Sequence, residues 1–149
     1  MARTQNLKNL STEKEGIKFL KSKVNNFIVP TKEERQHIYK QLGIDFLKYS
    51  KSVDGIVLNV SSAFEVKTIK DCLLIEIKTT KAKNVKELPY NVFFGFTKNE
   101  EDLFKAYKNY RLCIVHTEME EYIFLNYQEY ESLIQNKRIQ YQINFKSSL

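Results

Sequence analysis

The stretch from residue 73 to residue 80 (LLIEIKTT) constrains the fold most, because two charged residues interrupt an apolar run. Side chains alternate along a β-strand, so Glu76 and Lys78 share one face while Ile75 and Ile77 share the other. Apolar residues precede Glu76, which predicts a central strand. Charges on a central strand need a partner or a bound ion. The stretch therefore predicts a sheet with a polar site on one of its inner strands.

Asp54 precedes a second predicted strand and stands 22 positions before Glu76. Two carboxylates and a lysine on neighbouring strands form a site for a hard divalent cation and a phosphate. Magnesium prefers one or two carboxylates and takes other ligands from water and substrate phosphates. The ion lowers the pKa of a bound water, and a lysine beside it stabilises developing negative charge. Asp-Gly is also a common turn, and the downstream strand favours the ligand role.

A second Glu-x-Lys triplet, Glu65 and Lys67, leaves an alternative open. It follows a small polar segment and precedes a predicted turn, which is typical of an exposed hairpin. Glu76 and Lys78 are the favoured pair because their strand is the more apolar one.

Three segments carry a resemblance to known proteins: residues 75–80 (IEIKTT), 93–100 (FFGFTKNE) and 110–115 (YRLCIV). With Asp54 ahead of them, they resemble the PD-(D/E)XK nuclease superfamily over roughly residues 53–117, a little under half of the chain. The resemblance implies an α/β, restriction-endonuclease-like fold, in which helices flank a mixed central sheet. Val53 stands where the superfamily's name records a proline, and members vary at this position.

The same resemblance implies site residues and a cofactor, Mg²⁺. The implied metal ligands are Asp54 and Glu76, with Ile77 or its carbonyl completing the shell, and Lys78 is the implied catalytic lysine. Asn99 and Glu100 match a helix-opening motif and are candidates for positions near the site, although Glu100 is also explained as a capping residue. An acid on the first helix, found in many members, corresponds to Glu13 or Glu15.

The first 50 residues are predicted to be helical and residues 53–149 to form the sheet core of a single domain, 1–149, since no Gly/Ser/Pro linker divides the chain. Capping boxes predict helix starts at Thr12, Thr31 and Thr97, and Gly43 predicts a helix end. The predicted strands are residues 56–60, 63–69, 73–80, 91–96, 111–117 and 122–126, a helix is predicted over 127–136, and the alternating segment 138–145 is a candidate edge strand.

The net charge of +6 and the pI near 9.2 favour an acidic partner, of which nucleic acid is the commonest. An AT-rich genome explains a Lys- and Asn-rich chain equally well. Lysines in the loop after residue 80 are predicted to contact DNA phosphates together with Asn99; they are Lys81, Lys83 and Lys86. Cys72 and Cys113 stand in apolar contexts and are predicted to be buried thiols, while His37 and His116 lack the spacing of metal ligands.

The sequence thus predicts a magnesium-dependent DNA endonuclease, of a restriction or other defence system. Cutting both strands needs two sites, so a two-fold homodimer is the simplest assembly. A junction-resolving repair nuclease and an inactive DNA-binding module of the same fold are the alternatives, and DNA is not distinguished from RNA. No nucleotide-cofactor motif, apolar membrane span or signal region is found, so a cytoplasmic protein without membrane contact is expected.

Overall fold

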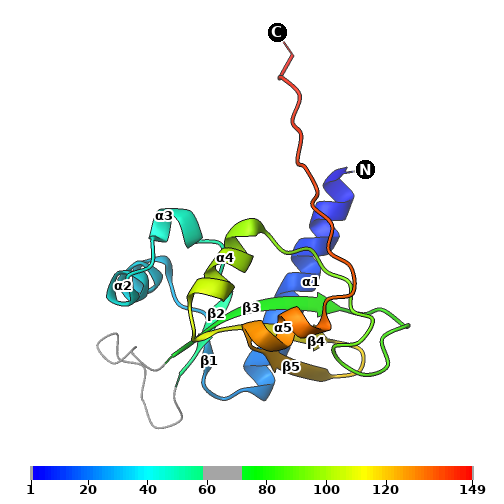
Figure 1. Cartoon of the computed structure of the whole chain (residues 1–149), viewed down its shortest axis with the longest axis horizontal. Coiled ribbons are helices and arrows are strands. Elements are labelled where there is room, and N and C mark those ends of the chain that lie inside the picture. Colours follow the sequence, from blue (N-terminus) through cyan, green and yellow to red (C-terminus); the bar gives the residue numbers. More distant parts are fainter. Residues whose placement is uncertain (1, 59–71, 149) are drawn as a thin grey trace.

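The computed structural model describes residues 2–58 and 72–148, with side chains described from Thr12 onward. It is a mixed α/β structure built on one five-stranded sheet (Figure 1). The strands lie in chain order: β1 Phe27–Ile28, β2 Gly55–Val57, β3 Leu73–Thr80, β4 Tyr110–His116 and β5 Glu121–Leu125. The helices are α1 Ala2–Lys23, α2 Lys32–Leu42, α3 Phe46–Tyr49, α4 Lys98–Ala106 and α5 Tyr127–Leu133.

The sheet is mixed because one of its strand pairs is parallel. Strands β1, β2 and β3 pair antiparallel, β3 and β4 pair parallel, and β4 and β5 pair antiparallel. Helix α4 makes the crossover that a parallel pair requires. The register sets Gly55 opposite Ile75 and Glu76 opposite Leu112. Asp54, one residue before β2, therefore lies beside the middle of β3.

Alternation along β3 and β4 divides the core into two layers. Leu74, Leu112 and Ile114 belong to the larger cluster, which also takes residues of α2, α4 and α5. Ile75 and Ile77 belong to the cluster on the other face, which helix α1 covers; Figure 1 shows α4 and α5 in front of the sheet and α1 behind it. Glu76 points to the side of the larger cluster, so its charge enters the layer beneath α4.

Several predicted element boundaries are confirmed. Helix α2 starts at the Thr31 capping box, with Glu34 as its partner, and ends at Gly43, whose φ of 71° is left-handed. Helix α4 starts at the Thr97 capping box with Glu100. The predicted strands at 73–80, 111–117 and 122–126 match β3, β4 and β5 to within one residue. Cys72 and Cys113 are buried thiols, as predicted.

The start of the first helix was predicted wrongly. Thr12 lies inside α1, which begins at Ala2, because Ser/Thr-x-x-Glu spacing also occurs in helix interiors. Helix α5 ends at Leu133, three residues earlier than predicted. In the part of the chain that the structure describes, no helix is both long and apolar enough to cross a membrane.

Two predicted strands are absent from the described sheet. Residues 91–96 alternate between exposed and half-buried but pair with no described strand, since Phe94 and Phe96 pack on the aromatic side chains of α4 and α5 instead. Segment 138–145 is extended and exposed. The predicted strand at 63–69, with Glu65 and Lys67, lies outside the described residues, as does the end of the strand predicted at 56–60.

Candidate functional site

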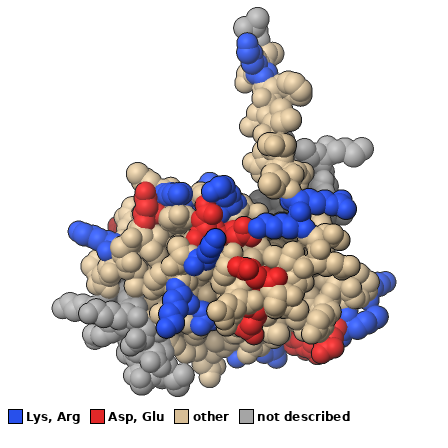
Figure 2. Space-filling model, viewed as in Figure 1, with Lys and Arg blue, Asp and Glu red and all other residues tan. Residues whose placement is uncertain are grey.

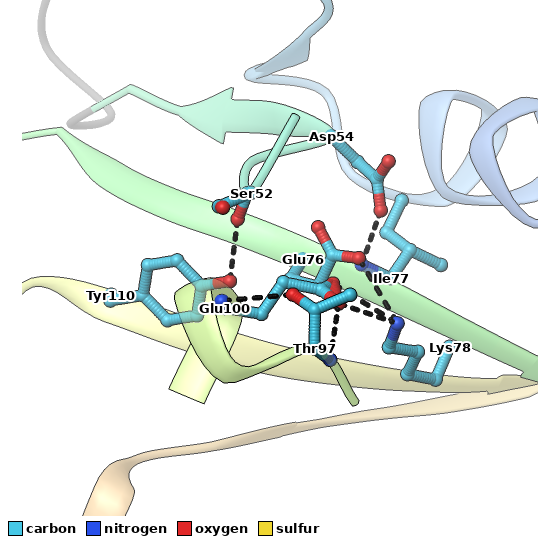
Figure 3. Close-up of polar contacts among 8 residues, drawn as sticks. All are labelled: Ser52, Asp54, Glu76, Ile77, Lys78, Thr97, Glu100 and Tyr110. Carbon is cyan, nitrogen blue, oxygen red and sulfur yellow. Dashed lines mark hydrogen bonds and ion pairs between the residues drawn. The ribbon is translucent and has the colours of Figure 1, made fainter. Parts of the chain in front are cut away.

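Asp54 lies directly against β3, at the point where β2 begins (Figure 3). Its main-chain N–H donates to the carbonyl of Ile75 at 2.8 Å, and its Oδ2 accepts from the amide of Ile77 at 2.7 Å. The Asp54 carboxylate thus accepts the hydrogen bond of the Ile77 amide, which a main-chain carbonyl would accept if β2 were longer. The side chain is held at a fixed position beside Glu76.

The segment before Asp54 is fixed by two side chains from other elements. Tyr110 is buried on β4, and its hydroxyl donates to the carbonyl of Ser52 at 2.6 Å. Arg35 of α2 donates to the carbonyl of Val53. These two hydrogen bonds determine where the main chain turns into β2.

Lys78 joins two carboxylates that come from different elements. Its Nζ lies 3.3 Å from Oε1 of Glu76 on the same strand and 3.1 Å from Oε2 of Glu100 on α4. Glu76 and Glu100 are 5% and 4% exposed, and the Lys78 side chain is 17% exposed. The Nζ also lies 5.4 Å from the centre of the Phe96 ring. The Lys78 side chain is therefore mostly enclosed.

Glu100 is held by the start of its own helix. Its Oε1 accepts from the N–H of Thr97 at 2.9 Å, and the Thr97 hydroxyl accepts from the N–H of Glu100 at 3.0 Å. The capping box thereby leaves Oε2 directed at Lys78. Glu100 was predicted both as a cap and as a neighbour of the site, and the geometry combines the two roles.

The cluster holds more negative than positive charge. Asp54, Glu76 and Glu100 stand around one lysine, and burial raises the pKa of Asp54, although the Ile77 amide opposes the rise. Burial raises the pKa of Glu76 well above its ordinary value, and the Glu100 and Asp54 carboxylates raise it further. Glu76 is the group that carries the largest cost of ionisation.

The partners of Glu76 are ionised more readily. Burial lowers the pKa of Lys78, but Glu76 and Glu100 outweigh that effect and leave it raised. Burial likewise opposes ionisation of Glu100, yet the Glu76 carboxyl, the Lys78 ammonium and the Thr97 amide together leave its pKa lowered. Lys78 and Glu100 therefore form a charged pair, and the raised pKa of Glu76 makes its ionisation unfavourable.

The donor set fits a hard cation at Asp54 and Glu76. Oε2 of Glu76 is buried and accepts no hydrogen bond from a donor among the described residues, which makes it a candidate ion ligand. Ile77 directs its amide toward Asp54, and the N–H and C=O of one strand residue point the same way. Its carbonyl therefore faces the same side. Among residues 2–58 and 72–148, no group of three His, Cys, Asp or Glu side chains has the arrangement of a metal site.

A groove of about 310 Å³ adjoins the cluster. Its walls come from α3, the turn after it and the start of α4: Leu47, Lys48, Ser50, Lys51, Ser52, Thr97 and Asn99. Asn99 donates to the carbonyl of Lys48 at 3.2 Å, which joins the two walls. Ser52 and Thr97 connect it to the cluster, because one precedes Asp54 and the other caps the helix of Glu100. Two lysines, Lys48 and Lys51, are among the residues that line the groove.

The lysines of the predicted loop are exposed, and one of them forms an ion pair with helix α1. Lys81 pairs with Glu15 of α1 at 2.7 Å, whereas Lys83 and Lys86 are exposed. Glu13 is also exposed, and its charge contributes to the raised pKa of Asp54. On the face seen in Figure 2, Lys and Arg side chains alternate with Asp and Glu and form no continuous basic surface.

The two histidines take ordinary structural positions. His116 is buried, and its ring nitrogens contact the main chain of Ala82 and Met119. His37 is exposed on α2 beside Gln41. Lys48 and Lys51 were not predicted from the sequence, because nothing local distinguishes them from other surface lysines of a basic chain.

Comparison of the chain with models of protein families, with curated proteins and with solved structures found no match.

Proposed function

We propose that this protein is a magnesium-dependent nuclease that hydrolyses phosphodiester bonds in DNA, with Asp54, Glu76 and Lys78 as its site. The observation that carries the proposal is the convergence of these three side chains, one from the residue before β2 and two from β3, in a cluster with surplus negative charge. A purely structural cluster would gain stability from neutral side chains of similar size. An excess of buried carboxylate is what a cation site requires.

The roles of the residues follow from their positions. Asp54 and Glu76 would hold the ion, together with the carbonyl of Ile77. A bound Mg²⁺ supplies a water of lowered pKa and neutralises charge on a phosphate oxygen. The Lys78 side chain is more exposed than those of Glu76 and Glu100, and its ammonium would stabilise charge on the phosphate undergoing attack. Glu100 orients Lys78 and keeps it charged.

The groove is the surface along which the DNA backbone would approach the site. Lys48 and Lys51 line its walls, and lysines bind phosphates without reading sequence. Asn99, a DNA contact predicted from the sequence, lines the same groove. The loop residues Lys81, Lys83 and Lys86 remain candidates for phosphate contact. A homodimer, with one site for each strand, remains the simplest arrangement for a double-strand cut.

The proposal is tested with the purified chain on supercoiled plasmid, genomic DNA, a four-way junction and duplex RNA, each with Mg²⁺ or with EDTA. We expect Mg²⁺-dependent cutting of DNA, abolished in Glu76→Gln. Discrete fragments from genomic DNA indicate a restriction or other defence nuclease, and cutting of the junction alone indicates a resolving enzyme. Binding without cutting in any metal contradicts the proposal and identifies an inactive DNA-binding module.

A further inference from the structure

The C-terminal segment, residues 138–146, alternates apolar and polar side chains (RIQYQINFK). Its four large apolar residues are almost wholly exposed: Ile139 85%, Tyr141 84%, Ile143 75% and Phe145 93%. Gln140, Gln142 and Asn144 occupy the alternate positions. Period-two alternation is the pattern of a strand that buries one face. Here the apolar face has no cover from the described residues of its own chain.

The segment leaves the domain at a defined point. Lys137 pairs with Glu101 of α4 at 2.7 Å, which fixes the chain just before the segment. From there the chain runs away from the sheet and from β5 (Figure 1). The segment is therefore presented outward and does not lie against its own sheet.

Strand β5 offers an edge on which such a segment fits. Among the described residues β5 pairs with β4 alone, so its other side presents main-chain N–H and C=O groups. Glu121 and Tyr122 at the start of β5 are exposed. Seven residues, 139–145, span the five residues of β5.

Charge favours this edge over the pairing of two such segments with each other. Residues 137–146 carry three basic residues and no acidic one, whereas residues 117–126 carry three glutamates and no basic residue. Basic residues stand at both ends of the segment, so either strand direction brings one to the acidic end of β5. Two segments pairing antiparallel with each other would instead set Arg138 near Lys146, and like charges opposite one another destabilise a sheet.

We propose that the C-terminal segment of one copy adds as a sixth strand to the β5 edge of a second copy, and that the exchange is reciprocal. Main-chain hydrogen bonds would supply affinity, and the apolar positions would supply register. A reciprocal exchange gives a two-fold dimer whose two interfaces are identical. The proposal goes beyond the proposed nuclease function and does not depend on it.

The test is sedimentation of the full chain over a range of concentrations. Gln142→Pro removes a main-chain N–H in the middle of the segment, and proline is not accommodated inside a paired strand. Since the segment is exposed, the domain itself should keep its fold, which circular dichroism verifies. Ser147→Pro, outside the alternating residues, is the matched control. We expect the Gln142→Pro dimer to weaken at least tenfold and the Ser147→Pro dimer to match the parent.

Disulfide trapping identifies the partner surface. Glu121→Cys is mixed with Lys146→Cys or with Arg138→Cys, which cover the two strand directions, while the native cysteines are buried. A cross-linked dimer that forms only in one of these mixtures supports the proposal. A monomer at every concentration, cross-linking of segment to segment, or the absence of a cross-linked dimer in both mixtures would each overturn it. Loss of nuclease activity alone would bear on the proposed function and leave this result intact.

Discussion

The Nζ of Lys78 on β3 lies 3.1 Å from Oε2 of Glu100 on α4, and both groups are largely enclosed. The contact joins the strand to the first turn of the crossover helix. Because Glu100 also completes the capping box of α4, the same carboxylate caps the start of the helix and binds the lysine. A change at either residue should alter stability and chemistry together, and the two effects can be separated by experiment.

Lys78→Met should abolish Mg²⁺-dependent cleavage and destabilise the fold. It removes the ammonium and leaves two buried carboxylates without their cation, which costs about 3 kcal/mol. DNA binding in Ca²⁺ should stay close to that of the parent, because phosphate affinity is spread over many lysines. Denaturation and single-turnover cleavage measure the two effects.

The double variant Lys78→Met/Glu100→Gln is the control for stability. Glutamine can still serve in a capping box, so the double variant removes both charges and keeps the helix start. We expect it to recover roughly 1–2 kcal/mol of the loss while remaining inactive. Lys98→Met, on the exposed face of α4, should change neither quantity. Full activity in the Lys78 single variant would remove the lysine from the proposed mechanism.

Glu76→Gln should stabilise the metal-free protein at neutral pH although it removes cleavage. The pKa of Glu76 is raised well above its ordinary value, so the ionised form is unfavourable in the fold. Glutamine keeps the size and removes that charge, and a gain of about 1 kcal/mol would raise the melting temperature by roughly 3 °C. Calorimetry without metal measures the shift. Glu65→Gln tests the competing triplet: loss of cleavage there with normal cutting by Glu76→Gln would show that the wrong pair was chosen.

Stabilisation by a divalent cation should increase with pH. A group whose folded-state pKa is raised contributes stability below its unfolded pKa, and that contribution is lost as pH rises through the folded value. Glu76 and Asp54 both have raised pKa values, so metal-free stability falls from about pH 4.5 upward as they ionise. Cation binding needs the ionised forms and releases protons. The rise in melting temperature on adding Ca²⁺ should therefore be larger at pH 8 than at pH 6, and equal shifts would exclude these carboxylates as ligands.

Lysines of the groove should contribute more to cleavage than lysines of the loop. Lys48→Ala/Lys51→Ala should weaken DNA binding, reduce cleavage, and lower the salt dependence of binding by about one unit of slope for each lysine–phosphate interaction removed. Lys83→Ala/Lys86→Ala removes the same charge from the loop and is the matched comparison. Binding titrations at several salt concentrations provide the slopes. Equal slopes in both variants and the parent would assign neither surface to DNA.

The sequence predicted the parts of this fold that depend on neighbours along the chain. Thr31 with Glu34, and Thr97 with Glu100, mark helix starts because a capping box is completed within four residues. The prediction at Thr12 was wrong, since the same spacing inside a long helix makes no cap. The strand predicted at 91–96 was also wrong, because apolar residues indicate that a segment is partly buried and do not indicate whether another strand lies alongside it.

The candidate site was only partly predictable. Alternation set Glu76 and Lys78 on one face of a strand, and that arrangement depends on local geometry alone. The contact of Asp54 with the Ile77 amide depends on the residue at which β2 begins to pair with β3. The contact of Glu100 with Lys78 depends on the path of the crossover helix. Lys48 and Lys51 come to line one groove with Asn99 through the packing of α3 against α4. Such tertiary relationships leave no signal in a single sequence.

The unpartnered Oε2 of Glu76 also bears on how this chain would respond to engineering. A selection for heat resistance, applied without selecting for activity, would favour replacement of the buried acid by a neutral residue. Consensus or directed-evolution campaigns would then yield robust variants that had lost the chemistry. A gain in thermal stability on replacing Glu76 would therefore indicate that this residue is kept for the proposed reaction and not for the stability of the fold.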